Sequence, residues 1–361
     1  MSLKARLQAE IGQNGPLTVA QYMTACLHDP QDGYYATRPR LGTDGDFITA
    51  PMVSQMFGEL VGLWCAETWM RLGRPSPVAW IEVGPGDGAL MADALKAVRA
   101  AAPGFLAAAR LAMVETSGPL RLAQQARLRD APAAIRWVGA LSELKDETPV
   151  ILAANEVLDC LPVRQFVRAG RGWAERMVGV DGEGRLAFGL AARPLDRVLP
   201  DAPPGAVIEV SPAQEAFGAE IGALVSRRGG AALLIDYGRD AAGFGDTLQA
   251  LKGHQKVSPL DAPGEADLTV HADFPAVLAA ATAEGALAAP ITTQGHWLDR
   301  LGIGARAAAL ARARPDKAES IARQLDRLTG PEQMGELFKV ACIHSDGLHP
   351  PGFTDEETID G

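Results

Sequence analysis

The middle of the chain alternates between short apolar runs and segments with helical periodicity. The apolar runs occupy residues 78–83, 111–114, 135–138, 150–153 and 231–235. Helical segments at 89–101 and 118–129 separate the first three of these runs. Uninterrupted apolar strands that alternate with helices are typical of a parallel sheet covered on both faces. The pattern therefore predicts an α/β fold with a Rossmann-like sheet, whose ligands bind at the carboxyl ends of the strands.

The regions around this alternation follow other patterns. A helix is expected to begin at Thr18-Val19-Ala20-Gln21 and to end near Leu27, and an amphipathic helix is expected over residues 54–72. Between the fourth and fifth apolar runs, alternating residues with glycine turns predict antiparallel hairpins. We expect a helical N-terminal cap at 1–75, a core at 76–161 and 207–349, a β-rich insertion at 162–206, and a flexible tail at 350–361.

Composition narrows the classes of partner. The formal charge of −10 argues against a nucleic-acid binder, which usually carries a basic surface, and favours a cationic protein segment as partner. The four cysteines lie far apart and form no zinc motif, so no metal is expected. The N-terminus shows no secretory signal, and the alanine-rich stretch 274–291 is interrupted by Glu284. We therefore expect no membrane insertion and a cytoplasmic protein, while a homodimer stays open.

A glycine loop follows the first apolar run. The chain there reads Glu82-Val83-Gly84-Pro85-Gly86-Asp87-Gly88-Ala89. Glycine lets the backbone turn tightly and lets a ligand approach without meeting a side chain, and the free amides at the following helix start face that ligand. The series E-x-G-x-G-x-G suits the nucleoside cofactor of a methyltransferase. The overlapping series G-x-G-x-x-A suits the dinucleotide of an NAD-linked oxidoreductase.

Acidic residues separate these two alternatives. A dinucleotide site needs an acidic residue about 20 residues further on, and the segment around Gly104 has none. Glu115 instead ends the next apolar strand, where its carboxylate can hold both ribose hydroxyls. Together with Glu82 and the additional Gly88, this placement favours S-adenosyl-L-methionine as the cofactor. The alternative for either carboxylate is simple solvation, and Asp87 can equally be a helix cap.

Three polar side chains follow the fourth apolar run directly: Asn155, Glu156 and Asp159. Polar groups at this place in a parallel sheet face the crevice beside the cofactor. Methyl transfer is an in-line displacement that depends on positioning. If the acceptor is an arginine, carboxylates orient its guanidinium better than neutral groups do. Glu156 and Asp159 are the candidates for this work, with helix capping as the alternative role for Asn155 or Asp159.

The ordered set of motifs resembles the MidA-like methyltransferase family over residues 18–345. The resemblance is carried by Asp32-Gly33-Tyr34-Tyr35, Gly45-Asp46-Phe47-Ile48-Thr49, Ser54-Gln55-Met56-Phe57-Gly58-Glu59, the glycine loop, Asn155-Glu156-Val157-Leu158-Asp159 and Ile235-Asp236-Tyr237-Gly238. It implies a seven-stranded methyltransferase sheet and a protein substrate. In a characterised mitochondrial member this substrate is an arginine of a respiratory complex I subunit.

The resemblance also implies further site residues. Thr49 would border the cofactor, and Asp46, Phe47 and Gln55 would border the substrate. One departure is Met52, which stands where the family commonly has an acidic residue, so the identity of the acceptor is open at this point.

The N-terminus shows no mitochondrial presequence, which fits a bacterial, cytosolic member of the family. Tyr34 and His254 are further candidates for binding the substrate. Tyr34 can stack on a cationic group or simply pack the N-terminal segment. His254 can act as a general base or be structural. The alternatives to a protein arginine methyltransferase are a non-catalytic assembly factor that retains this fold and an NAD-linked oxidoreductase.

Overall fold

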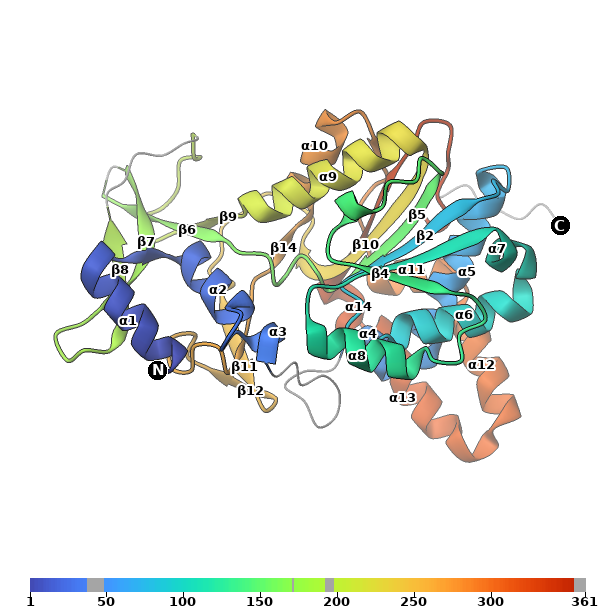
Figure 1. Ribbon diagram of the computed structural model, residues 1–361, viewed down its shortest axis with the longest axis horizontal. Helices are drawn as coiled ribbons and strands as arrows, with labels where there is room; N and C mark the ends of the chain where they lie inside the picture. Colours follow the sequence, from blue (N-terminus) through green and yellow to red (C-terminus); the bar gives the residue numbers. More distant parts are fainter. Residues whose placement is uncertain (38–48, 171, 192–197, 354–361) are drawn as a thin grey trace. The chain divides into compact units, whose positions relative to one another are not determined.

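The computed structural model describes residues 1–37, 49–170, 172–191 and 198–353 (Figure 1). Its described residues group into two compact units, each assembled from three stretches of the chain. The first unit takes its residues from Met1–Phe47, Leu158–Gln214 and Ala241–Asp273. The second takes them from Ile48–Val157, Glu215–Asp240 and Phe274–Gly361.

The second unit is built on a mostly parallel sheet. Its main path runs β15-β17-β10-β5-β2-β3-β4, in which β10, β5, β2, β3 and β4 are parallel neighbours and β17 is antiparallel to β10 and β15. A further short strand, β16 (Thr292–Thr293), pairs with β17. The strands of the main path are β2 (Val78–Val83), β3 (Ala109–Val114), β4 (Ile135–Val138), β5 (Val150–Asn155), β10 (Gly230–Arg239), β15 (Leu287–Ala288) and β17 (Phe338–His344).

This sheet confirms the predicted α/β, Rossmann-like class. The five predicted apolar runs form β2, β3, β4, β5 and β10, the parallel part of the sheet. In the described residues the main path of this sheet has seven strands and β16 pairs beside it, so the expected total of seven is not confirmed.

Helices lie on both sides of this sheet, with α9 and α10 on one side and α5 and α6 on the other (Figure 1). The predicted helix at 89–101 is α6, and the one predicted at 118–129 ends two residues earlier as α8. Helix α9 (Pro212–Arg228) belongs to this unit from Glu215 onward. The other helices of the unit are α4 (Ala50–Val53), α5 (Gln55–Arg71), α6 (Ala89–Ala101), α7 (Pro103–Ala108), α8 (Gly118–Arg127), η1 (Leu141–Glu143), α10 (Phe274–Ala283), α11 (Gln294–Arg300), α12 (Ile303–Ala313), η2 (Pro315–Lys317), α13 (Ala318–Thr329) and α14 (Met334–Leu337).

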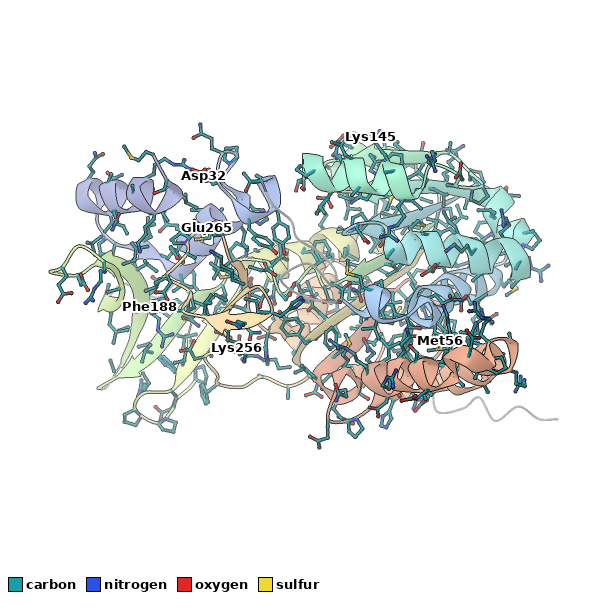
Figure 2. The ribbon with its side chains drawn as sticks, turned by 90° about the horizontal axis from the view of Figure 1, so that it is seen from below. Asp32, Met56, Lys145, Phe188, Lys256 and Glu265 are labelled. Atoms are coloured by element: carbon teal, nitrogen blue, oxygen red, sulfur yellow. The ribbon has the colours of Figure 1, made fainter. Side chains whose placement is uncertain are left out.

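Helix α5 is buried more widely than the single apolar face that its periodicity predicts. Met56 (Figure 2), Trp64 and Cys65 are all fully or nearly fully buried although they point to different sides of the helix. The reason is that α5 packs against α4, α6, α12 and strands β5 and β10. Its partner α6 approaches closely: a Cβ added at Gly62 would lie 2.7 Å from the Cα of Ala94.

The first unit combines the N-terminal helices with two antiparallel sheets. One sheet has the order β1-β7-β6-β9 with β8 beside β7, and the other has the order β12-β11-β13. The insertion thus forms the predicted antiparallel hairpins, to which the N-terminal β1 adds a short strand. The elements are α1 (Leu3–Asn14), β1 (Leu17–Thr18), α2 (Val19–His28), α3 (Tyr34–Thr37), β6 (Arg164–Ala169), β7 (Gly172–Val180), β8 (Leu186–Ala191), β9 (Val207–Val210), β11 (Gln249–Lys252), β12 (Gln255–Val257), β13 (Asp267–Thr269) and β14 (Ala272–Asp273).

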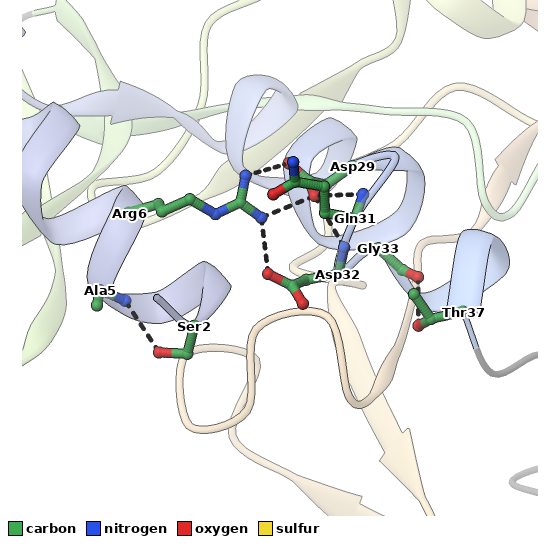
Figure 3. Close-up of polar contacts among 8 residues, drawn as sticks. All are labelled: Ser2, Ala5, Arg6, Asp29, Gln31, Asp32, Gly33 and Thr37. Atoms are coloured by element: carbon green, nitrogen blue, oxygen red, sulfur yellow. Dashed lines mark hydrogen bonds and ion pairs between the residues drawn. The ribbon is translucent and has the colours of Figure 1, made fainter.

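A polar cluster fixes the turn that precedes the tyrosine pair of the first unit (Figure 3). The Arg6 guanidinium donates to both carboxylate oxygens of Asp29 and to Asp32. Asp29 also accepts from the backbone N–H groups of Gln31 and Asp32. Chiefly because of the Arg6 hydrogen bonds, the pKa of Asp29 falls to about 2. A Cβ at Gly33 would lie 2.5 Å from the Asp29 backbone, so this position requires glycine.

The predicted segments relate to these units as follows. The helical part of 1–75 divides between the units, because α5 belongs to the second. Residues 351–353 pack against the second unit, where the Pro351 carbonyl accepts from the Trp64 indole, and 354–361 lie outside the described residues. The predicted division into domains stays a prediction. Among the described residues, no helix combines the length and apolar character needed to span a bilayer.

Candidate active site

The carboxyl ends of the parallel strands of the second unit bring together the residues that follow them. Val83 pairs in register with Val114 of β3 and with Ala154 of β5. Asn155 in turn lies beside Ile235 of β10. The glycine loop after β2, Glu115 after β3 and the Asn155-Glu156 pair after β5 therefore share one edge of the sheet.

The glycine loop has a backbone that other residues adopt only with strain. Gly84, Gly86 and Gly88 have φ angles of 62°, 53° and 85°, in the left-handed region where glycine has no penalty. A Cβ at Gly84 would also lie 2.6 Å from Cγ2 of Val157. Pro85 is buried, and its carbonyl accepts from the N–H of Gly88 to close the turn. At Gly84, Gly86 and Gly88 the loop thus presents backbone without a side chain.

Glu82 is buried inside β2, one residue before the strand ends. It is 3% exposed, and its Oε2 atom has no hydrogen-bond partner among the described residues. Burial raises the pKa of Glu82 well above its ordinary value, and the nearby Asp87 and Glu115 raise it further. The Oδ1 atom of Asn155 is a second buried acceptor without a described partner. Spare acceptors beside an open backbone loop fit a nucleoside that carries amine and hydroxyl donors.

Asp87 has the helix-start role that was one of its two alternatives. Its carboxylate accepts from the N–H of Ala89, the first residue of α6, at 3.0 Å. The same carboxylate pairs with Arg127 of α8. Asp87 thereby ties the loop to two helices.

Glu115 is held by a buried hydrogen-bond network. One carboxylate oxygen accepts from the backbone N–H of Ser117 at 2.7 Å, and the other accepts from the side-chain amide of Gln124 at 3.1 Å. The same Gln124 nitrogen donates to the carbonyl of Gly86 at 2.8 Å. Burial raises the pKa of Glu115, while these donors oppose the shift. The acid and the glycine loop are therefore connected through one side chain.

Sequence reasoning missed Gln124 and Trp137. The indole N–H of Trp137 donates to the side-chain oxygen Oε1 of Gln124 at 3.0 Å. The available signal was helical spacing, since Gln124 stands between Leu120 and Leu128 on the buried face of α8. A polar amide in a row of leucines needs hydrogen-bond partners inside the protein.

The Asn155-Glu156 pair leaves β5 with an unusual backbone. Glu156 has φ of 55°, although it is not glycine, and its N–H donates to the carbonyl of Ile235. Its Oε1 atom accepts from the Asn155 side chain at 3.0 Å and from the N–H of Ala50 at 3.2 Å. Glu156 is therefore oriented by two donors, one of which belongs to the segment that begins at Thr49.

The predicted residues around this segment lie in the same unit. Thr49 precedes α4, and its carbonyl accepts from Met52 and Val53. Gln55 is exposed at the start of α5 and donates to Glu59, which is paired with Arg306 at 2.7 Å. The structure shows what these side chains contact, and their binding roles stay predictions.

The remaining predicted site residues are not among the described residues of the second unit. Asp159, Tyr34 and His254 belong to the first unit. Asp159 and Tyr34 are buried there, whereas His254 lies exposed in the turn between β11 and β12. Asp46 and Phe47 lie outside the described residues. The roles of all five stay predictions from sequence.

Within 1–37, 49–170, 172–191 and 198–353, no group of three or more histidine, cysteine or acidic side chains is arranged to hold an ion.

Comparison with known proteins addresses the cofactor. A model of S-adenosyl-L-methionine-dependent methyltransferases matches residues 60–292. The chain is 33% identical to the mitochondrial protein arginine methyltransferase NDUFAF7 of Danio rerio, over 95% of this chain and 86% of the relative. It is 34% identical to the Mus musculus protein of the same name, over 92% of this chain and 82% of the relative.

A solved structure extends the similarity to the fold and its ligand. The crystal structure of a Burkholderia thailandensis protein bound to S-adenosyl-homocysteine superimposes with a TM-score of 0.82 at 30% identity. The match covers 98% of this chain and 92% of that one. The cofactor predicted from the glycine loop is thereby confirmed as S-adenosyl-L-methionine, in preference to a nicotinamide dinucleotide. The MidA-like resemblance is confirmed as well, and the chain belongs to the S-adenosyl-L-methionine-dependent methyltransferases.

Proposed function

We propose that this enzyme methylates an arginine side chain of a protein, with a respiratory complex I subunit or an equivalent partner as substrate. The names of its relatives support the arginine acceptor, and the MidA-like motifs support the complex I partner. The observation that carries the proposal is the oriented carboxylate of Glu156 at the edge of the sheet that also holds the glycine loop.

On the cofactor side, each residue has a distinct task. When bound, S-adenosyl-L-methionine supplies a methyl group on a sulfonium. The backbone of Gly84, Gly86 and Gly88 would border its methionine and ribose parts, since no side chain stands in the way. Glu115 would accept from the two ribose hydroxyls, because its carboxylate is already fixed by Ser117 and Gln124. Glu82 would offer its spare oxygen to a donor group of the cofactor.

On the acceptor side, Glu156 would bind the guanidinium. A carboxylate pairs with two guanidinium N–H groups in a fixed geometry, so it directs one nitrogen toward the methyl group. The methylated nitrogen would lose one proton to water, and Glu156 would balance the positive charge that remains on the product. The left-handed backbone of Glu156 and its hydrogen bonds from Asn155 and Ala50 orient this carboxylate before the substrate arrives.

Neutralising Glu156 tests this proposal. The Glu156→Gln variant keeps an oxygen that can accept from Asn155 and Ala50 but removes the charge. We expect methyl transfer to fall by about a hundredfold, while affinity for S-adenosyl-L-methionine stays within about twofold of wild type. The measurement is mass spectrometry of arginine methylation on complex I subunits, in cells that lack the protein and are complemented with each variant. Glu67→Gln, on the surface of α5, is the matched control.

The results distinguish the alternatives. Wild-type methylation by Glu156→Gln would remove the role of Glu156. If wild type binds the cofactor but changes no arginine on any subunit, the acceptor is another group. If Glu156→Gln restores complex I assembly without methylation, the protein acts as an assembly factor.

A further inference from the structure

Gln124 is a fully buried amide whose three hydrogen bonds connect three separate parts of the second unit. Its nitrogen donates to the Gly86 carbonyl and the Glu115 carboxylate, and its oxygen accepts from the Trp137 indole. The partners fix the orientation of the amide. An indole N–H can only donate and a backbone carbonyl can only accept, so exchanging the amide oxygen and nitrogen would break both bonds.

Packing alone does not account for an amide at this position. Gln124 lies in a buried row with Leu120 and Leu128, where leucine would fill the space without a desolvation cost. Burying an amide is unfavourable unless its hydrogen bonds are replaced inside the protein. At Gln124 the lost hydrogen bonds to water are replaced by hydrogen bonds to Gly86 of the glycine loop and to Glu115. The amide therefore connects the loop with this acid.

We infer that Gln124 is a positioning residue that sets the Glu115 carboxylate and the Gly86 backbone in register, so that both meet the ribose of the cofactor together. The inference rests on the proposed ribose-binding role of Glu115. Gln124 itself touches no reacting atom. It acts by restricting Glu115 to one rotamer and by holding the glycine loop at a constant distance from it.

The charged groups around Glu115 make the pH dependence of cofactor binding a suitable measurement, because a residue that acts only by packing would not change it. Arg121 of α8 favours the charged form of Glu115. On the β2 side the neighbouring acid is Glu82, which also interacts with Asp87 of the loop. Burial raises the pKa of Glu115, and the Gln124 hydrogen bond lowers it. Removing that donor therefore raises the pH below which Glu115 is protonated and no longer accepts from both hydroxyls.

The experiment measures S-adenosyl-L-methionine affinity of the full chain by calorimetry between pH 5 and 8. We expect Gln124→Leu to raise Kd at least tenfold at pH 7 and to move the midpoint of the pH dependence upward. Gln125→Leu, the same substitution one residue on at an exposed position, should leave Kd within twofold and the midpoint unchanged. Trp137→Phe keeps a ring but loses the donor to Gln124, and should produce a smaller change in the same direction. It serves as the test if Gln124→Leu does not fold.

The outcomes separate this inference from the proposed function. Affinity and pH midpoint like wild type in Gln124→Leu and Trp137→Phe would overturn the inference. A weaker affinity with an unchanged midpoint would also overturn it, because the role would then be structural packing. If Glu115→Gln itself binds like wild type, the proposed ribose contact is wrong. If Glu115→Gln is weak and Gln124→Leu is not, only the role of Gln124 fails.

Discussion

The backbone of Glu156 illustrates how a single residue can store strain at a site. A left-handed φ at a residue other than glycine costs of the order of 1 kcal/mol and persists only where the surroundings impose it. At Glu156 they do so through the bond from its N–H to Ile235 and through the donors to its carboxylate. The strain is consistent with the role proposed for this carboxylate.

Asp29 gives a prediction at the same scale. Its pKa in the folded protein is about 2, below the ordinary value of 3.8. A depressed acid pKa adds stability above the unfolded value and loses it as pH falls through the folded value. We expect Asp29→Asn to lower the melting temperature at pH 7 by roughly 2–4 °C. The difference from wild type should shrink as pH falls and be small near pH 2.

The control for this prediction is Asp130→Asn, since Asp130 is exposed and lies 3.6 Å from the Arg129 guanidinium, its one ion-pair contact among the described residues. It should melt like wild type at every pH. A melting difference for Asp29→Asn that is the same at pH 7 and at pH 2 would show that charge is not the cause.

Individual site residues could be predicted where a polar residue stands at the end of an apolar run. Glu82, Glu115 and Asn155 stand at the carboxyl ends of apolar runs, and the structure places all three at one edge. Gln124 and Ala50 could not be found this way, because their contacts to the site join residues 38 and 106 positions apart. Such contacts depend on how α8 and α4 pack, which local periodicity does not specify.

Helix α5 shows that close packing between elements depends on small residues. Gly58 and Gly62 lie one turn apart on the side of α5 that meets α6, and a Cβ at either would come within 3.0 Å of Leu90, Asp93 or Ala94. On the other side of the sheet, Gly218 and Gly222 of α9 approach α10 in the same manner. In each of the two layers, glycine thus allows a pair of neighbouring helices to pack closely.

The α5–α6 contact gives a prediction for stability. Gly62→Ala places its new methyl group 2.7 Å from the Ala94 backbone, which has no flexible end that could move aside. We expect the variant to lose about 1–3 kcal/mol of unfolding free energy in urea, despite the better helix propensity of alanine. Gly304→Ala in α12, where a Cβ meets nothing within 4 Å, should be neutral or slightly stabilising. Equal stabilities of the two variants would contradict the close approach.

At the scale of elements, the pattern along the chain predicted the parallel strands and the helices between them. The predicted strands and helices of the core match β2, α6 and β4 at both ends. The two-residue strands β1, β15 and β16 were not predicted, because they exist through pairing with β7 and β17 and carry no pattern of their own. The wide burial of α5 was missed for the same reason, since it arises from neighbours distant in sequence.

At the scale of the whole molecule, the chain leaves and re-enters each unit repeatedly. The sheet of the second unit is interrupted after β5 by the segment that forms β6 to β9, and again after β10. The net charge of −10 belongs to this scale too, since it favours a basic partner, such as a protein segment around the proposed acceptor arginine.

Removing the last strand tests how the second unit is completed. β17 fills the position between β10 and β15 and covers the edge of β10. A chain that ends at Leu337 should therefore expose a long apolar edge and aggregate, as judged by its soluble fraction and size-exclusion profile. A chain that ends at Phe353 keeps every described contact of the sheet and should behave as the full chain. A soluble, monomeric product from the shorter chain would show that β17 is dispensable.

The place of β17 also bears on how the protein is made in a cell. Translation delivers β10 about 100 residues before the strand that covers its edge, which at about 5–20 residues per second corresponds to about 5–20 seconds. During that interval the nascent chain carries an open apolar edge that other chains can join. Chaperone capture of the growing polypeptide, and release only after the final strand has emerged, is the expected route to the active enzyme.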